Sequence, residues 1–212
     1  YKTAEVYFSY IAAVCFFVVN LFWKAGETMG NIIDYLKWRG DLTFSQDAFN
    51  EVDNLLLSYV AYVNLEGLSV GAGEESVTLE ELSRRFFVLH SEEELAADKS
   101  FTRLAPYIVK MMAQSNRYRT SIISNYVNMV NPQLEFQFSA VQLDLSDGSK
   151  NFCFRGTDDN IVAWKEDFNL GLGEVPAQKL ASEYLNRFGV GTSPIRVSGH
   201  SKGGNLAIYA AA

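Results

Sequence analysis

The stretch of residues 195–211, which reads IRVSGHSKGGNLAIYAA, constrains the fold of this chain more than any other. Within it, Gly199-His-Ser-Lys-Gly203 has the G-x-S-x-G spacing of a nucleophile elbow, in which a serine occupies a tight turn between a strand and a helix. A Cβ at Gly199 or Gly203 would collide with backbone beside so tight a turn, and Gly204 lets the helix pack closely. We therefore predict a short strand, an exposed Ser201 and an alanine-rich helix. The alternative interpretation is a glycine-rich turn with a capping serine.

The residues before this turn predict a sheet. Residues 134–145 alternate apolar and polar side chains, as a half-buried strand does. Asp147-Gly148 is typical of a hairpin turn, and residues 151–155 follow as a second strand. Pro176 begins a helix that we expect to end at Phe188. Strands separated by helices indicate the α/β fold class. We also predict a helix over 161–168 and a glycine-rich loop over 171–173.

The front of the chain predicts helices. Thr78 and Ser91 each precede a glutamate by three residues, the spacing of a capping box at a helix N-terminus. Pro106 suits the first turn of another helix. A short amphipathic turn or helix is predicted over 31–38. Further helices are predicted over 49–64, where apolar residues recur at helical spacing, and over 121–129. The sequence thus divides into a helical section, 29–132, which is a candidate cap, and an α/β core, 133–212.

A second motif adds to the elbow. Phe154-Arg-Gly-Thr157 is followed by Trp164-x-x-Asp167 and then by GHSKGG at the elbow. This series resembles the pattern of class 3 lipases. The whole stretch from Met29 resembles more closely the mostly bacterial, lipase-like family known as domain of unknown function 2974, or Mbeg1-like. The resemblance implies an α/β-hydrolase (lipase-like) fold and a serine hydrolase mechanism, and it supplies no substrate.

The resemblance also assigns roles to residues. Ser201 matches the nucleophile. Thr157 matches the position that supplies one backbone amide to an oxyanion hole, and the amide of Lys202 would supply the other. For Arg155 and Asp167 we weigh an ion pair that braces the oxyanion loop against two separate solvated charges. Trp164 is expected in the core.

The Lys202 side chain is open to three interpretations. It could be solvated, pair with a nearby carboxylate, or attract an anionic substrate.

The partners of the nucleophile are missing from the pattern. In this fold the triad acid and histidine follow the serine, but KGGNLAIYAAA after Ser201 contains neither. His200 should point away from Ser201, and His90 is expected at a helix C-terminus. The helix also reaches Ala212 without a capping or turn residue. We therefore expect the chain to continue past residue 212 into strands that carry the acid and the histidine.

Two functions follow as expectations. The first is a serine hydrolase that acts on an ester or other acyl substrate, lipase- or esterase-like, with a small-molecule acyl or lipid-like substrate as its partner. The alternative is a non-catalytic protein with an α/β-hydrolase-like fold and an incomplete triad.

Composition excludes other classes of function. The formal net charge is −7, which argues against nucleic-acid binding, since that needs a basic face. Two cysteines and two histidines leave little material for a disulfide framework or a metal site, so we predict neither metal nor cofactor. Arg117 and Arg119 are expected on a solvated helix face.

Residues 4–23 form an apolar run just long enough for a transmembrane helix. Ala25-Gly-Glu27, which can be encoded by a purine-rich, ribosome-binding-like sequence, stands just before Met29. We favour the hypothesis that residues 1–28 are a non-native leader and that the protein is cytoplasmic. The alternatives are a membrane anchor over 4–23, and a signal or buried helix.

Overall fold

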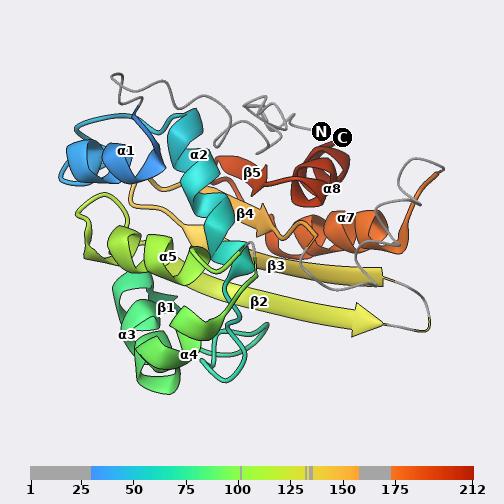
Figure 1. The fold of residues 1–212 in the computed structure, drawn as a ribbon. Coiled ribbons are helices and arrows are strands. Elements are labelled where there is room, and N and C mark those ends of the chain that lie inside the picture. Colours follow the sequence, from blue (N-terminus) through green and yellow to red (C-terminus); the bar gives the residue numbers. More distant parts are fainter. Residues whose placement is uncertain (1–29, 101, 132, 134–135, 158–172) are drawn as a thin grey trace, which may run out of the picture.

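Five strands form one sheet in the order β1–β2–β3–β4–β5 within the part of the chain that the structure describes (Figure 1). That part is residues 30–100, 102–131, 133, 136–157 and 173–212 of a computed structural model. Neighbouring strands are antiparallel from β1 to β4, whereas β4 and β5 are parallel. The strands are β1 (Val77–Thr78), β2 (Ile122–Asn131), β3 (Phe136–Asp144), β4 (Lys150–Phe154) and β5 (Ile195–Gly199).

The long strand β2 corrects the helix predicted over 121–129. A register shift lies between Ser124 and Val127, and Asn125 has a positive φ of 54°. This bulge shifts the alternation of side chains along the strand. Apolar residues therefore fall at 122, 123, 126, 127, 129 and 130, and most of these positions also fit a helical spacing. Residues 122–131 form a strand because they pair with β3 and β1.

Helices cover both faces of the sheet (Figure 1). Alternate residues of β4 separate the two cores: Cys153 joins the cluster beneath the front helices, whereas Phe152 and Phe154 join the cluster beneath the last two helices. The front helices are α1 (Ile32–Arg39), α2 (Glu51–Ser58), the 3-10 helix η2 (Tyr59–Tyr62), α3 (Leu79–Leu89), α4 (Glu92–Ala97) and α5 (Ala105–Gln114), and the last two are α7 (Pro176–Phe188) and α8 (Lys202–Ala211).

Local signals placed most of these helices correctly. The Thr78 hydroxyl accepts a hydrogen bond from the Glu81 amide at 3.2 Å, and the Ser91 hydroxyl accepts one from the Glu94 amide at 3.1 Å. Pro106 lies in the first turn of α5. The helix predicted over 49–64 is confirmed as α2 followed by η2. The predicted helix at 161–168 lies outside the described residues, as does most of the loop at 171–173.

The α/β class is confirmed, with a mostly antiparallel sheet. The hairpin predicted at Asp147-Gly148 joins β3 to β4, with φ of +81° at Gly148, and α7 has the predicted bounds. Strand β2 in the front section pairs with β3, so the sheet crosses residue 132. The division at that residue stays a prediction.

Among the helices that the structure describes, none has the length and apolar character needed to cross a membrane. Residues 4–23 lie outside that part of the chain, so the structure says nothing of the leader or the membrane anchor.

Arg117 is buried, and its expected place on a solvated face is wrong. Its side chain and that of Asp53 are both 0% exposed, and they form an ion pair at the N-terminus of α2. Arg117 Nε donates to Asp53 Oδ1 at 2.7 Å, and its Nη atoms donate to the carbonyls of Leu42, Asp47 and Ala48. Burial lowers the pKa of the guanidinium, but the hydrogen bonds and charge of Asp53 outweigh this and raise it. The pair ties the loop between α1 and α2 to the segment after α5.

Candidate active site

Ser201 lies in the predicted turn between β5 and α8. Its side chain is exposed, and its backbone has φ 58° and ψ −127°. A residue with a Cβ rarely adopts a positive φ, and such strain persists only where the surroundings impose it. The turn thus presents the hydroxyl to solvent at the N-terminus of a helix, where the helix dipole favours negative charge.

The glycines around Ser201 are required by contact with backbone atoms. A Cβ on Gly199 would lie 2.2 Å from the carbonyl of Gly203, and a Cβ on Gly203 would lie 2.2 Å from the Phe154 carbonyl oxygen. Gly204 is less confined, since its Cβ would lie 3.2 Å from the Gly199 oxygen. These distances explain why no larger residue fits at Gly199 or Gly203. The role of the three glycines in supporting the turn stays a prediction.

The end of β4 lies beside the elbow. Phe154 pairs with Gly199 in the parallel register, so the segments after both residues leave the same edge of the sheet. A Cβ on Gly203 would also lie 2.9 Å from the Gly156 amide nitrogen. Thr157, which is buried, follows directly. The fold thus brings the segment of Thr157 and the segment of Ser201 together, although 44 residues (201 − 157) separate them in the sequence.

Arg155 is buried, which excludes the solvated interpretation of its charge. Its Nη2 donates to Asn128 Oδ1 on β2 at 2.8 Å. Asp167 and Trp164 lie outside the described residues, so the ion pair with Asp167 and the core position of Trp164 stay predictions.

Lys202 is buried as well, and the solvated interpretation of its side chain is wrong. Its Nζ donates to the Gln137 carbonyl on β3 at 3.2 Å. The charged side chain therefore points down toward the sheet, while the backbone of Lys202 begins α8 directly after Ser201.

The two histidines of the sequence face other groups. His200 Nδ1 lies 3.2 Å from the Tyr62 hydroxyl, and burial lowers the pKa of its imidazole. His90 caps the C-terminal end of α3, as expected, and its Nδ1 lies 3.2 Å from Glu94 Oε1.

A buried polar cluster beneath the elbow was not predicted. Asn151 on β4 donates through Nδ2 to Asn54 Oδ1 of α2 at 2.9 Å, and the Ser198 hydroxyl donates to Asn151 Oδ1 at 2.8 Å. Asn54 Nδ2 also donates to the Val197 carbonyl at 3.2 Å. The available signal was Asn151, a polar residue at an inward position of a strand otherwise rich in apolar residues.

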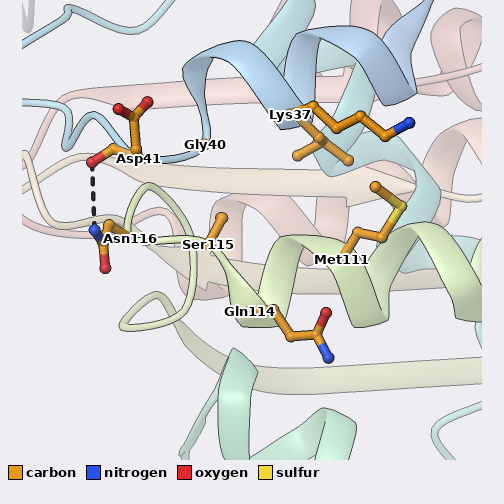
Figure 2. Close-up of a pocket in the computed structure, with 8 residues that line it drawn as sticks. Lys37, Gly40, Asp41, Met111, Gln114, Ser115 and Asn116 are labelled. Atoms are coloured by element: carbon orange, nitrogen blue, oxygen red, sulfur yellow. Dashed lines mark hydrogen bonds between the residues drawn. The ribbon is translucent and has the colours of Figure 1, made fainter.

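The described surface also has a groove of about 330 Å³ between α1 and α5, lined by Lys37, Asp41, Met111 and Gln114 among others (Figure 2). Asn116 Nδ2 donates to the Asp41 carbonyl oxygen at its rim. The groove shares no residue with the elbow, and we assign no function to it. Among the residues that the structure describes, no three His, Cys, Asp or Glu side chains gather as metal ligands.

The site is thus a strained, exposed serine on a tight turn between a strand and a helix of a mixed α/β fold. Residues 112–212, which include this site, match the Mbeg1-like family. The match confirms the expected family for that part of the chain. The predicted relationship to lipases is not part of it. No curated protein matches the chain, and no solved structure does.

Proposed function

We propose that this chain carries the nucleophile and the oxyanion-binding segment of a serine hydrolase with an α/β-hydrolase-like, lipase-like fold. The observation that carries the proposal is the backbone of Ser201, with φ 58° and ψ −127° between β5 and α8. A capping serine has extended backbone and accepts a hydrogen bond from the helix, so it does not require this conformation. An exposed nucleophile on a tight turn does.

The chemistry would proceed by acyl transfer. Ser201 Oγ would attack the carbonyl of an ester or related acyl substrate, and the hydroxyl proton would pass through a base to the leaving alcohol. The amides of Thr157 and Lys202 would hold the oxyanion, each contributing about 3–4 kcal/mol to transition-state stabilisation. Water would then release the acyl group.

The base and the acid of the triad are expected downstream of residue 212, because His90 and His200 face Glu94 and Tyr62. By analogy, the helical section 29–132 would act as a cap that favours acyl or lipid-like small molecules. We propose a cytoplasmic location, no nucleic-acid partner, no metal and no cofactor. Contact with a membrane would require that residues 4–23 be a genuine anchor.

The engagement of both histidines favours one alternative, a non-catalytic protein that keeps the fold and lacks a complete triad. A serine hydroxyl without a base is a weak nucleophile, so the two functions differ in the reactivity of Ser201.

Labelling with a fluorophosphonate probe distinguishes them. The folded protein, extended past residue 212 to include the proposed acid and histidine, would be incubated with the probe, and the adduct would be located by mass spectrometry. The proposal expects an adduct on Ser201, none with Ser201→Ala, and unchanged labelling with Ser45→Ala, a control at an exposed loop serine. Hydrolysis of p-nitrophenyl butyrate would decrease in proportion as the probe modifies Ser201. If this extended wild-type protein gives no adduct and no hydrolysis above buffer, the non-catalytic alternative holds.

A further inference from the structure

The hydroxyl of Tyr62 reaches the elbow from the front of the chain. Tyr62 is the last residue of η2, and 138 residues separate it from His200 in the sequence. Its Oη lies 3.2 Å from His200 Nδ1 and 3.2 Å from the His200 carbonyl oxygen. The two rings meet edge to face, with centroids 6.1 Å apart and an interplanar angle of 60°. One phenol therefore contacts both the side chain and the backbone of the residue before Ser201.

The His200 carbonyl is also the acceptor that closes the turn. The Gly203 amide donates to it at 3.0 Å, and this bond encloses Ser201. A phenol has a single proton to donate. The hydrogen bond from Tyr62 Oη to the carbonyl uses that proton. The contact between Oη and His200 Nδ1 is then a hydrogen bond only if Nδ1 carries a proton, so we expect the Nδ1–H tautomer of His200.

The same hydroxyl lies against the oxyanion segment. A Cβ on Gly156 would lie 2.4 Å from Tyr62 Oη and 2.3 Å from the His200 carbonyl oxygen. The residue before Thr157 thus packs directly on the phenol and on the carbonyl that the phenol binds. Movement of Tyr62 would alter the spacing between the segments of Thr157 and Ser201.

We propose that Tyr62 is a positioning residue for Ser201: its hydroxyl holds the His200 carbonyl and thereby the strained turn and the Gly156 segment beside it. This inference rests on the proposed function. Asn54 acts at the preceding strand, because its Nδ2 donates to the Val197 carbonyl at 3.2 Å. The front helices thus hold β5 at two points, one in the strand and one in the turn.

The test compares Tyr62→Phe with Tyr59→Phe in the full chain. Tyr59 begins the same 3-10 helix, and no hydrogen bond of the described residues joins it to the elbow. Since the chain has two histidines, imidazole ¹⁵N–¹H spectra resolve His200 once His90→Gln has assigned the other. We expect Tyr62→Phe to shift His200 from the Nδ1–H toward the Nε2–H tautomer. It should also speed hydrogen exchange of the Gly203 amide about five- to tenfold, the ratio expected for loss of one neutral hydrogen bond.

The functional readout is the rate at which the fluorophosphonate labels Ser201 in the protein extended past residue 212. We expect Tyr62→Phe to slow it about tenfold and Tyr59→Phe to leave it within twofold of wild type. Unchanged His200 and Gly203 signals in Tyr62→Phe would refute the proposal that Tyr62 holds the turn. Changed signals with an unchanged labelling rate would refute its role in positioning Ser201. If the wild-type chain does not label, the proposed function and the positioning of a nucleophile fail together, whereas the spectra still show separately whether Tyr62 holds the turn.

Discussion

Replacing Asp53 by asparagine tests the strongest buried electrostatic contact of the described fold. The Asp53 carboxylate accepts hydrogen bonds from Arg117, Tyr118 and Tyr35, and its Oδ2 also accepts from the Asn50 amide at 2.9 Å as part of a capping box. Asp53→Asn removes the charge and leaves the Arg117 guanidinium, 0% exposed, without its main counter-ion. Loss of one partner of a buried pair typically costs about 3–5 kcal/mol. Asp47 Oδ2 lies 3.7 Å from Arg117 Nη1 and still compensates part of its charge. We therefore expect Asp53→Asn to lower the free energy of unfolding by about 3 kcal/mol.

Asp34→Asn is the matched control. Asp34 occupies the same third position of a capping box in α1, where its Oδ2 accepts from the Asn31 amide at 3.0 Å at an exposed site. An acidic residue in the first turn of an exposed helix contributes about 0.3–1 kcal/mol. The difference between the two variants therefore measures the buried contacts of Asp53 with Arg117 and the two tyrosines.

Equilibrium unfolding in urea, followed by far-UV circular dichroism, measures both variants. With an m-value of about 2 kcal/mol/M, Asp53→Asn should lower the midpoint by about 1.5 M and Asp34→Asn by less than about 0.5 M. Arg117→Met should destabilise the chain to a similar extent as Asp53→Asn. If the midpoints of the two aspartate variants agree within about 0.3 M, the buried contacts of Asp53 do not stabilise the fold.

Two further predictions concern the elbow and the front helices. Gly203→Ala places a Cβ 2.2 Å from the Phe154 carbonyl oxygen, so it should lower the free energy of unfolding by about 1–3 kcal/mol and abolish labelling of Ser201, whereas Gly204→Ala should retain most labelling; equal labelling of both variants would contradict the steric argument. For Glu81, hydrogen bonds from Arg84 and then Arg85 lower the carboxyl pKa from its ordinary 4.5 to about 2. The unfolded chain thus binds the proton more tightly than the folded chain. The ionised Glu81 carboxylate therefore stabilises the folded state above pH 4.5, and this stabilisation is lost as the pH falls toward 2. Melting temperatures between pH 2 and 6 should fall less steeply with acid for Glu81→Gln than for the control Glu80→Gln, and parallel curves would refute the assignment.

The front section is part of the framework of the candidate site as well as a covering layer. Strand β2 belongs to it and pairs with β3, and Asn128 on β2 accepts a hydrogen bond from Arg155 next to the oxyanion segment. Tyr62 and Asn54 reach the elbow and its strand from the same section. Variants in the front helices are therefore expected to affect Ser201 through the backbone that holds it.

The sequence by itself determined the features whose causes lie within a few residues. Helix starts at Thr78 and Ser91, the hairpin at Gly148 and the serine turn at 199–203 depend on side chains and backbone angles three or four positions apart. Such signals are readable from a single chain, and the structure has each of them where the sequence places it.

Only the tertiary structure decided the contacts between distant residues. The apolar spacing of β2 fitted a helix until pairing with β3 and the bulge at Asn125 fixed it as a strand. Arg117 lies 64 residues from Asp53, and Tyr62 lies 138 residues from His200, so no local pattern marks either pair. Burial changes what a charged or polar side chain does, since an unpaired group in the interior is costly and must find a partner. Arg117 and Lys202 look like surface residues in the sequence. They lie inside the fold, where Arg117 pairs with Asp53 and Lys202 donates to the Gln137 carbonyl.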